Sequence, residues 1–214
     1  MKKNQIVYIT LLIYIILLAL ENTHHLSHWT NFLLGNYHYY SIPLPKNILD
    51  SIPKLVKNIN NYQDYTFIDF GSGYGNILLE YNNLFKKLIG VELNKTSHDQ
   101  AKLVLNNYKN ISLYNTSMEK YKFPNEKIIL YMYEPLFELK CKDRDKIYKD
   151  VINNLYNNNN KSYIIYIRAN TISNVIDNCY YNEDYFKNKF KLISKCKLGL
   201  FPLTREIYFL ESLN

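Results

Sequence analysis

Residues 67 to 80 read FIDFGSGYGNILLE and hold three closely spaced glycines, Gly71, Gly73 and Gly75. The apolar run 66–70 is typical of a buried strand, and residues 74–82 have the pattern of a helix. Glycine suits the segment between them, because the chain must turn tightly there and bring its backbone close to a ligand without interference from a Cβ atom. We therefore expect a strand, a ligand-binding glycine loop and a helix, in this order.

The spacing of the glycines separates the possible ligands. A dinucleotide fingerprint, G-x-G-x-x-G, requires a third glycine at position 76 or 78, where the chain has Asn76 and Leu78. The G-K-[ST] ending of a phosphate-binding P-loop is also absent. The remaining pattern is an acid, Asp69, followed by three alternating glycines.

A second acid follows the next predicted strand. Residues 87–93 read KLIGVEL, and Glu92 stands near the end of this run. A carboxylate in this position can accept hydrogen bonds from both hydroxyls of a ribose. Asp69 and Glu92, with the glycines between them, would define a nucleoside-shaped site at the carboxyl edge of a sheet. The alternative is a tight structural turn beside a surface glutamate.

Strand and helix patterns alternate along the rest of the chain, which favours a parallel sheet covered on both faces. Further strands are predicted over 111–114, 127–133, 162–168, 191–198 and 206–211, and further helices over 45–58, 95–108, 143–156 and 182–189. The last two strands are joined by about seven residues, which is too few for a parallel crossover. We predict an α/β, Rossmann-like sheet of seven mostly parallel strands that ends in a C-terminal antiparallel hairpin.

The N-terminal segment is strongly apolar. Residues 6–20 read IVYITLLIYIILLAL, after Lys2 and Lys3 and before Glu21. As a helix this segment would span about 22 Å, less than the roughly 30 Å of a hydrocarbon core, and local thinning can close the difference. Three interpretations remain open: a membrane anchor, a cleaved signal peptide, or a helix packed on its own domain. The expected organisation is a hydrophobic segment at 1–21, a connector at 22–44 and a catalytic domain at 45–214.

Composition limits the function classes. Hydrophobic residues make up 47% and aromatic residues 15% of the chain, which excludes a disordered, collagenous or coiled-coil protein. The net charge of +7 comes from scattered lysines, so it indicates a solvated surface and gives no strong signal of a nucleic-acid partner. The three cysteines form no C-x-x-C pair, and we expect free thiols and no metal site.

The stretches FIDFGSGYGNILLE (67–80) and KKLIGVELNKTSHDQAKLVL (86–105) resemble the class I S-adenosylmethionine-dependent methyltransferases. The similarity extends over about residues 37 to 212 and is specific to motifs in the first half. It is strongest to small bacterial and viral members, and the chain also resembles membrane-anchored protein-lysine methyltransferases, which pair an N-terminal apolar segment with such a core. The family's sheet of seven strands also ends in an antiparallel hairpin.

The resemblance implies S-adenosylmethionine as cofactor and assigns its contacts. The residues that would hold its amino-acid end are Asp69, Gly71, Ser72, Gly73 and Gly75. Glu92 would bind the ribose hydroxyls, and Leu93 would pack near the adenine. Family members often place an Asp in the loop after the third strand, whereas this chain has none there, so the backbone of Ser117 and Met118 would substitute.

The resemblance also points to an acceptor site after the fourth strand. Residues 133–136 read YEPL, where related enzymes have Asn-Pro-Phe or a similar motif. Tyr133 and Glu134 are therefore the candidate catalytic residues, since a carboxylate can bind an amine or remove its proton. The alternative is a glutamate without a catalytic role on a loop. Residues 40–45, together with Tyr166, Arg168 and Asn170, are further candidates for the lining of the site.

We expect a methyltransferase that N-methylates an amine such as a protein lysine, anchored in a membrane by one segment of unknown topology. Methyl transfer from a sulfonium needs alignment and deprotonation rather than a nucleophile triad. The alternatives are a non-catalytic nucleoside-binding or interaction protein with a degenerate methyltransferase fold, an RNA methyltransferase, and, for location, the cytoplasm.

Overall fold

The computed structural model describes residues 46–136, 141–169, 185–198 and 205–214. The chain divides into two compact units, residues 1–56 and 57–214. In the first unit, the described residues form helix α3 (Lys46–Val56), whose buried residues Ile48, Ile52 and Val56 follow one another at four-residue steps. The predicted segments 1–21 and 22–44 lie outside the described residues, so the predicted domain limits stay a prediction.

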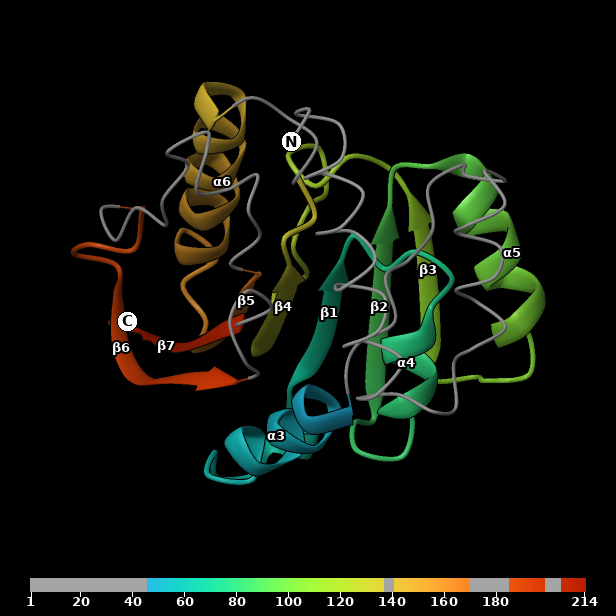
Figure 1. The fold of residues 1–214 in the computed structure, drawn as a ribbon, viewed down its shortest axis with the longest axis horizontal. Helices are drawn as coiled ribbons and strands as arrows, with labels where there is room; N and C mark the ends of the chain where they lie inside the picture. Colours follow the sequence, from blue (N-terminus) through green and yellow to red (C-terminus); the bar gives the residue numbers. More distant parts are fainter. Residues whose placement is uncertain (1–45, 137–140, 170–184, 199–204) are drawn as a thin grey trace, which may run out of the picture. The chain divides into compact units, whose positions relative to one another are not determined.

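The second unit contains one seven-stranded sheet, in the order β3-β2-β1-β4-β5-β7-β6, as Figure 1 shows. Its strands are β1 (Thr66–Phe70), β2 (Lys87–Glu92), β3 (Ile111–Asn115), β4 (Ile128–Tyr133), β5 (Ser162–Ala169), β6 (Phe190–Leu198) and β7 (Arg205–Ser212). The first five strands run parallel, and β7 pairs antiparallel with both β5 and β6. The predicted Rossmann-like sheet with its C-terminal hairpin is therefore confirmed.

Three α-helices and one short 3-10 helix accompany the sheet in the described part of this unit. They are η1 (Tyr62–Asp64), α4 (Asn76–Glu80), α5 (Lys95–Leu105) and α6 (Cys141–Tyr156). Helices α4 and α5 lie between consecutive parallel strands, as the alternating pattern predicts. Helix α4 follows the glycines directly, so the predicted order of strand, glycine loop and helix is present.

The central strands are apolar runs because the sheet is buried on both faces. All five residues of β1 are buried, and so are the first five residues of β4. One face packs against α6, where Val151, Ile152 and Leu155 join Ile68 and Leu130 in one buried hydrophobic cluster. Each fully buried side chain of this size contributes about 1.5–3 kcal/mol. This core fixes the carboxyl edge of the sheet, where the candidate site residues lie.

Two of the predicted helical segments are absent from the described helices. The helix predicted over 182–189 is wrong in its described part, because residues 185–189 form turns. Asn188 has a φ of 64°, a left-handed conformation that no helix continues through, and the Lys189 amide bonds to the Phe186 carbonyl at 3.0 Å. The apolar segment 6–20 lies outside the described residues, and no helix within those residues is long and apolar enough to cross a membrane.

Candidate active site

The glycine loop has the backbone conformation that its sequence predicts. Gly71, Gly73 and Gly75 have φ angles of 79°, 52° and 79°, which residues with a Cβ atom rarely adopt. The amides of Gly71 and Ser72 both donate to the Val91 carbonyl, at 2.9 and 3.2 Å. These bonds fasten the loop to the end of β2, so the loop and that strand end form one rigid edge.

Two of the glycines also allow close packing. A Cβ atom on Gly71 would stand 2.7 Å from Cβ of Pro135, and one on Gly75 would stand 2.4 Å from Cδ1 of Leu105. The glycine loop therefore touches both α5 and the segment that follows β4. Because Pro135 is the neighbour of Glu134, this contact brings the predicted acceptor segment next to the predicted cofactor loop.

The Glu92 carboxylate is held by two backbone amides. Its Oε2 accepts a hydrogen bond from the Gly73 amide at 2.8 Å, and its Oε1 accepts one from the Asn94 amide at 2.7 Å. One donor belongs to the glycine loop and the other to the turn that begins α5. Both carboxylate oxygens keep further lone pairs, so the group can still accept hydrogen bonds from a ligand.

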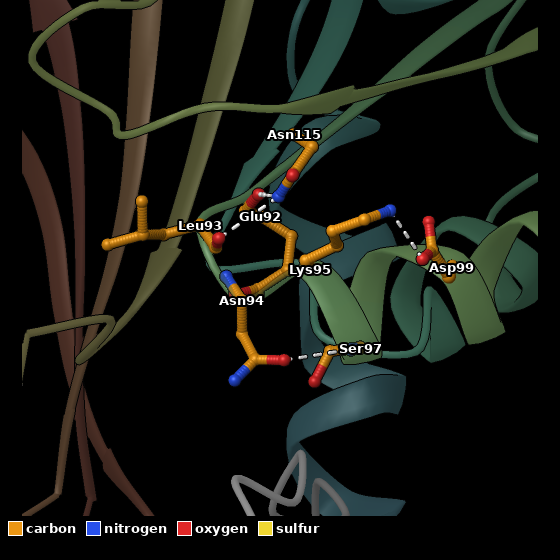
Figure 2. Close-up of polar contacts among 7 residues, drawn as sticks. All are labelled: Glu92, Leu93, Asn94, Lys95, Ser97, Asp99 and Asn115. Carbon is orange, nitrogen blue, oxygen red and sulfur yellow. Dashed lines mark hydrogen bonds and ion pairs between the residues drawn. The ribbon is translucent and has the colours of Figure 1, made fainter.

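A short network fixes the turn after β2, shown in Figure 2. The Asn115 side-chain amide donates to the carbonyls of Glu92 and Leu93, at 2.8 and 3.0 Å, and so ties the end of β3 to this turn. The Asn94 side chain caps α5 by accepting a hydrogen bond from the Ser97 amide at 3.0 Å. Leu93 is 70% exposed, so its apolar side chain is available to a flat apolar ligand group.

Asp69 is a buried carboxyl group with an unusual pKa. Asp69 is only 3% exposed, and no hydrogen bond from the described residues is among the causes that shift its pKa. Burial, followed by the charge of Glu92, raises the pKa of Asp69 from an ordinary value of 3.8 to about 8. A carboxyl group in such surroundings favours its neutral form until a cation approaches.

Several buried polar atoms near this edge lack hydrogen-bond partners. They are Ser72 Oγ in the glycine loop, Ser117 Oγ after β3, Tyr131 OH on β4 and His98 Nδ1 on α5. Leaving such a group unpaired costs about 1–3 kcal/mol, so each of these atoms is a candidate partner for a polar ligand group. A ligand with amino, carboxylate and hydroxyl groups, such as the predicted cofactor, fits these residues.

Ser117 and Met118 begin the connection from β3 to β4. The Met118 side chain is 8% exposed and belongs to the core cluster, together with Phe70 and Tyr121. The Ser117 carbonyl accepts hydrogen bonds from the Lys120 and Tyr121 amides, both at 3.2 Å. The Met118 side chain is thus used for packing, and what these two residues offer to a ligand is the Ser117 hydroxyl and backbone groups.

Glu134 has a strained backbone. Four non-glycine residues of the described chain have a positive φ, and the other three are asparagines, which tolerate it. Glu134, with a φ of 38°, is the exception, while its amide donates to the Ile167 carbonyl at 3.2 Å. Strained non-glycine residues of this kind cost about 1–3 kcal/mol and concentrate at functional sites.

Tyr133 is paired with an arginine that the sequence motifs do not indicate. Nε of Arg205, at the start of β7, donates to the Tyr133 hydroxyl at 3.0 Å. Burial raises the pKa of Tyr133, the Arg205 charge opposes that shift, and Glu134 adds to it. Burial also raises the pKa of Tyr148 and Tyr166, and the Glu134 charge contributes to both shifts. The Glu134 carboxylate therefore lies within electrostatic reach of these three tyrosine hydroxyls.

The other residues predicted to line the site are described only in part. Arg168 is buried on β5, in register with Glu206 of β7, whereas residues 40–45 and Asn170 are outside the described residues. Two surface cavities of about 280 and 430 Å³ flank the loop at residues 119–124. None of the predicted site residues lines either cavity, so the candidate site is defined by its polar groups and backbone geometry.

Solved structures show what this arrangement resembles. The N-methyltransferase NodS from Bradyrhizobium japonicum WM9, in complex with S-adenosyl-L-homocysteine, is 9% identical, with a TM-score of 0.64 over 80% of this chain and 89% of that one. The chain has the fold of the class I S-adenosylmethionine-dependent methyltransferases.

Two further structures share this methyltransferase fold. Magnesium protoporphyrin IX methyltransferase from Synechocystis PCC 6803 is 11% identical, with a TM-score of 0.59 over 92% of this chain and 98% of that one. A putative RNA methyltransferase from Pyrococcus horikoshii is 15% identical, with a TM-score of 0.57 over 86% of this chain and 96% of that one. No protein-family model matches the sequence, and neither does the sequence of any curated protein.

Proposed function

We propose that this chain is an S-adenosylmethionine-dependent methyltransferase. The observation that carries the proposal is the position of Glu92, whose carboxylate is fixed by the amides of Gly73 and Asn94 at the carboxyl edge of the sheet. Ligands of open α/β sheets bind outside this edge, and an acid at the end of the second strand is suited to ribose hydroxyls.

The other end of the cofactor has matching groups. Asp69 and the glycine loop would hold its amino-acid portion, and the unpaired Ser72 hydroxyl is a further polar group in that loop. Leu93 is exposed beside Glu92, where it would cover the adenine. The Ser117 hydroxyl and backbone replace the Asp that related enzymes often use there.

The cofactor supplies an activated methyl group, so the protein has to orient the acceptor and remove its proton. An amine acceptor, for example a protein lysine, suits Glu134, whose carboxylate can accept the hydrogen bond of the amine or take its proton. The strained φ of Glu134 and the contact of Pro135 with the glycine loop favour a role at the reacting group. Tyr133, held by Arg205, would orient the acceptor beside it.

Two other functions compete with this proposal. The substitution of Glu134 for the family's Asn motivates a non-catalytic nucleoside-binding protein with the same fold. An RNA acceptor is the second, since one structure with this fold is a putative RNA methyltransferase. The amine acceptor is preferred to RNA because a carboxylate at the acceptor position repels phosphate and favours a cation.

The test is transfer of labelled methyl from S-adenosylmethionine to a cell lysate by the full chain. Label in protein that is lost on protease treatment supports the amine proposal, and label that is lost on ribonuclease treatment identifies an RNA acceptor. Binding of S-adenosylmethionine without methyl transfer to any fraction indicates a non-catalytic protein that binds the cofactor.

We also propose that residues 1–21 anchor the protein in a membrane, because residues 6–20 carry no charge. The full chain should then resist extraction from membranes by alkaline carbonate. A chain that starts near Asn36 should be soluble and still bind S-adenosylmethionine. Unfolding of the shortened chain would show instead that the segment belongs to the folded core.

A further inference from the structure

The surroundings of Asp69 give the cofactor site an additional property. Asp69 is the fourth of the five buried residues of β1, in register with Gly90 on β2 and Tyr131 on β4. Gly90 contributes no side chain, and the space where its Cβ atom would stand is taken by Leu78, Leu113 and the Ser72 hydroxyl. Asp69 is thus a buried acid that lies between a strand position without a side chain and the Tyr131 position, and among the described residues the one charge that shifts its pKa is the negative charge of Glu92.

The second acid at this edge, Glu92, already accepts hydrogen bonds from two backbone amides. The Gly73 and Asn94 amides both bond to the Glu92 carboxylate, which leaves a second carboxyl group within electrostatic reach of Asp69. The titratable group that acts on Asp69 is Glu92 from β2, and the Asp69 charge in turn contributes to the raised pKa of Tyr131 on β4. No lysine, arginine or histidine of the described chain is among the charges that shift its pKa.

We propose that Asp69 is protonated in the empty site and releases this proton to solvent when a ligand places an ammonium group beside it. A buried carboxyl group without donors and close to a second acid is most stable as the neutral acid. An ammonium group reverses this preference, because it pairs with the ionised form and donates hydrogen bonds to it. The O–H bond of the acid breaks, buffer takes the proton, and the carboxylate remains paired with the ligand cation.

This inference rests on the proposed function, since it takes the amino-acid end of S-adenosylmethionine as the cation. It adds that the site selects ligands by charge. A nucleoside without the ammonium group, such as 5′-methylthioadenosine, leaves Asp69 neutral and forgoes the ion pair. The affinity for S-adenosylmethionine should increase close to tenfold between pH 6 and 7, because ionisation of a single group is linked to binding.

The proton can be counted by titration calorimetry of the full chain at pH 7 in two buffers of different ionisation enthalpy, phosphate and Tris. S-adenosylmethionine should release close to one proton per site, and 5′-methylthioadenosine should release none. The α-amino group of the ligand stays largely protonated at this pH, since such groups titrate near 7.7–8.0.

Two variants identify the source of the proton. Asp69→Asn should bind S-adenosylmethionine without releasing a proton and with an affinity that does not change over this pH range. Asp64→Asn removes an exposed aspartate of the same unit and should release a proton as the parent does. If Asp69→Asn fails to fold, the source of the proton is tested by comparing the proton release caused by the two ligands on the parent protein.

The results distinguish a failure of the Asp69 inference from a failure of the proposed methyltransferase function. Binding of S-adenosylmethionine without proton release, or equal release by Asp69→Asn or with 5′-methylthioadenosine, overturns the inference and leaves the proposed function standing. Absence of any binding of S-adenosylmethionine to the parent protein contradicts the proposed function and the inference together.

Discussion

The backbone amide of Gly73 and the carboxylate of Glu92 are joined by a hydrogen bond of 2.8 Å across 19 residues of sequence. The bond connects the middle of the glycine loop to the end of the neighbouring strand. The Asn94 amide, at 2.7 Å, holds the second carboxylate oxygen. The Glu92 side chain therefore orders the glycine loop and also presents its remaining lone pairs at the site.

Replacing Glu92 by alanine should weaken S-adenosylmethionine binding by about 1.5–3 kcal/mol, the scale of hydrogen bonds to a charged group. Calorimetric titration measures this loss directly. Glu80→Ala, an exposed glutamate at the end of α4, is the matched control and should bind as the parent does. An unchanged affinity in Glu92→Ala would remove this carboxylate from the cofactor site.

A methyl group added at Gly75 should destabilise the fold. Alanine at a φ of 79° costs about 1–2 kcal/mol, and its Cβ atom would also stand 2.4 Å from Leu105 Cδ1. Denaturant unfolding of Gly75→Ala, Leu105→Ala and the double variant measures both effects. We expect the double variant to lose less free energy of unfolding than the sum of the singles, because Leu105→Ala removes the clash. Strict additivity would mean that the loop and α5 are not in contact.

Glu134 should show opposite effects on activity and stability. Glu134→Gln should keep cofactor affinity and lower methyl transfer by roughly 10²-fold, the usual scale for a positioned acid-base group. Glu134→Gly and Glu134→Asn should raise the free energy of unfolding by about 1 kcal/mol, because both residues tolerate the positive φ.

The two readouts separate the possible roles of Glu134. Full methyl transfer by Glu134→Gln would reduce this residue to a loop position and leave the cofactor half of the account intact. A Glu134→Gly variant that unfolds more easily than the parent would show that its backbone is not strained.

The raised pKa of Asp69 makes the stability of the ligand-free protein depend on pH. A folded-state pKa of about 8, against an ordinary value of 3.8, means that the folded state binds the proton more tightly than the unfolded chain. The associated stability is complete below about pH 4 and is lost as the pH rises through 8. Asp69→Asn removes this loss, so its melting temperature should exceed that of the parent by a margin that grows from pH 5 to pH 8. A margin that stays constant over this range would show that Asp69 does not titrate there.

Much of this fold could be predicted from the sequence, because its signals are local. The strands with continuous apolar runs, such as β4 and β5, are placed within one residue, since burial on both faces requires that composition. The hairpin of β6 and β7 follows from a connection too short to cross over. The segment at 185–189 was mispredicted because the left-handed Asn188 ends any helical turn there, and nothing in the local pattern shows this.

The candidate site also has one part that the sequence predicts and one part that it does not. The glycine loop and its acids could be found from spacing, since the ligand-binding backbone needs glycine at particular positions. The bond from Arg205 to Tyr133 joins residues 72 apart in sequence and depends on β7 lying next to β5. The unpaired hydroxyls of Ser72 and Tyr131 likewise follow from burial, which only the packed sheet determines.

The most direct test of the account is calorimetric titration of the parent protein and of Gly73→Arg with S-adenosylmethionine and, separately, with NADH. A side chain at the φ of 52° of Gly73 costs about 1–2 kcal/mol, which a stable domain can tolerate, so the variant should fold, as circular dichroism can verify. The parent should bind S-adenosylmethionine and not NADH, and the arginine side chain should abolish binding in a folded variant. Tight binding of NADH with no response to S-adenosylmethionine, or unchanged affinity in Gly73→Arg, would contradict the assignment of the glycine loop to an S-adenosylmethionine site.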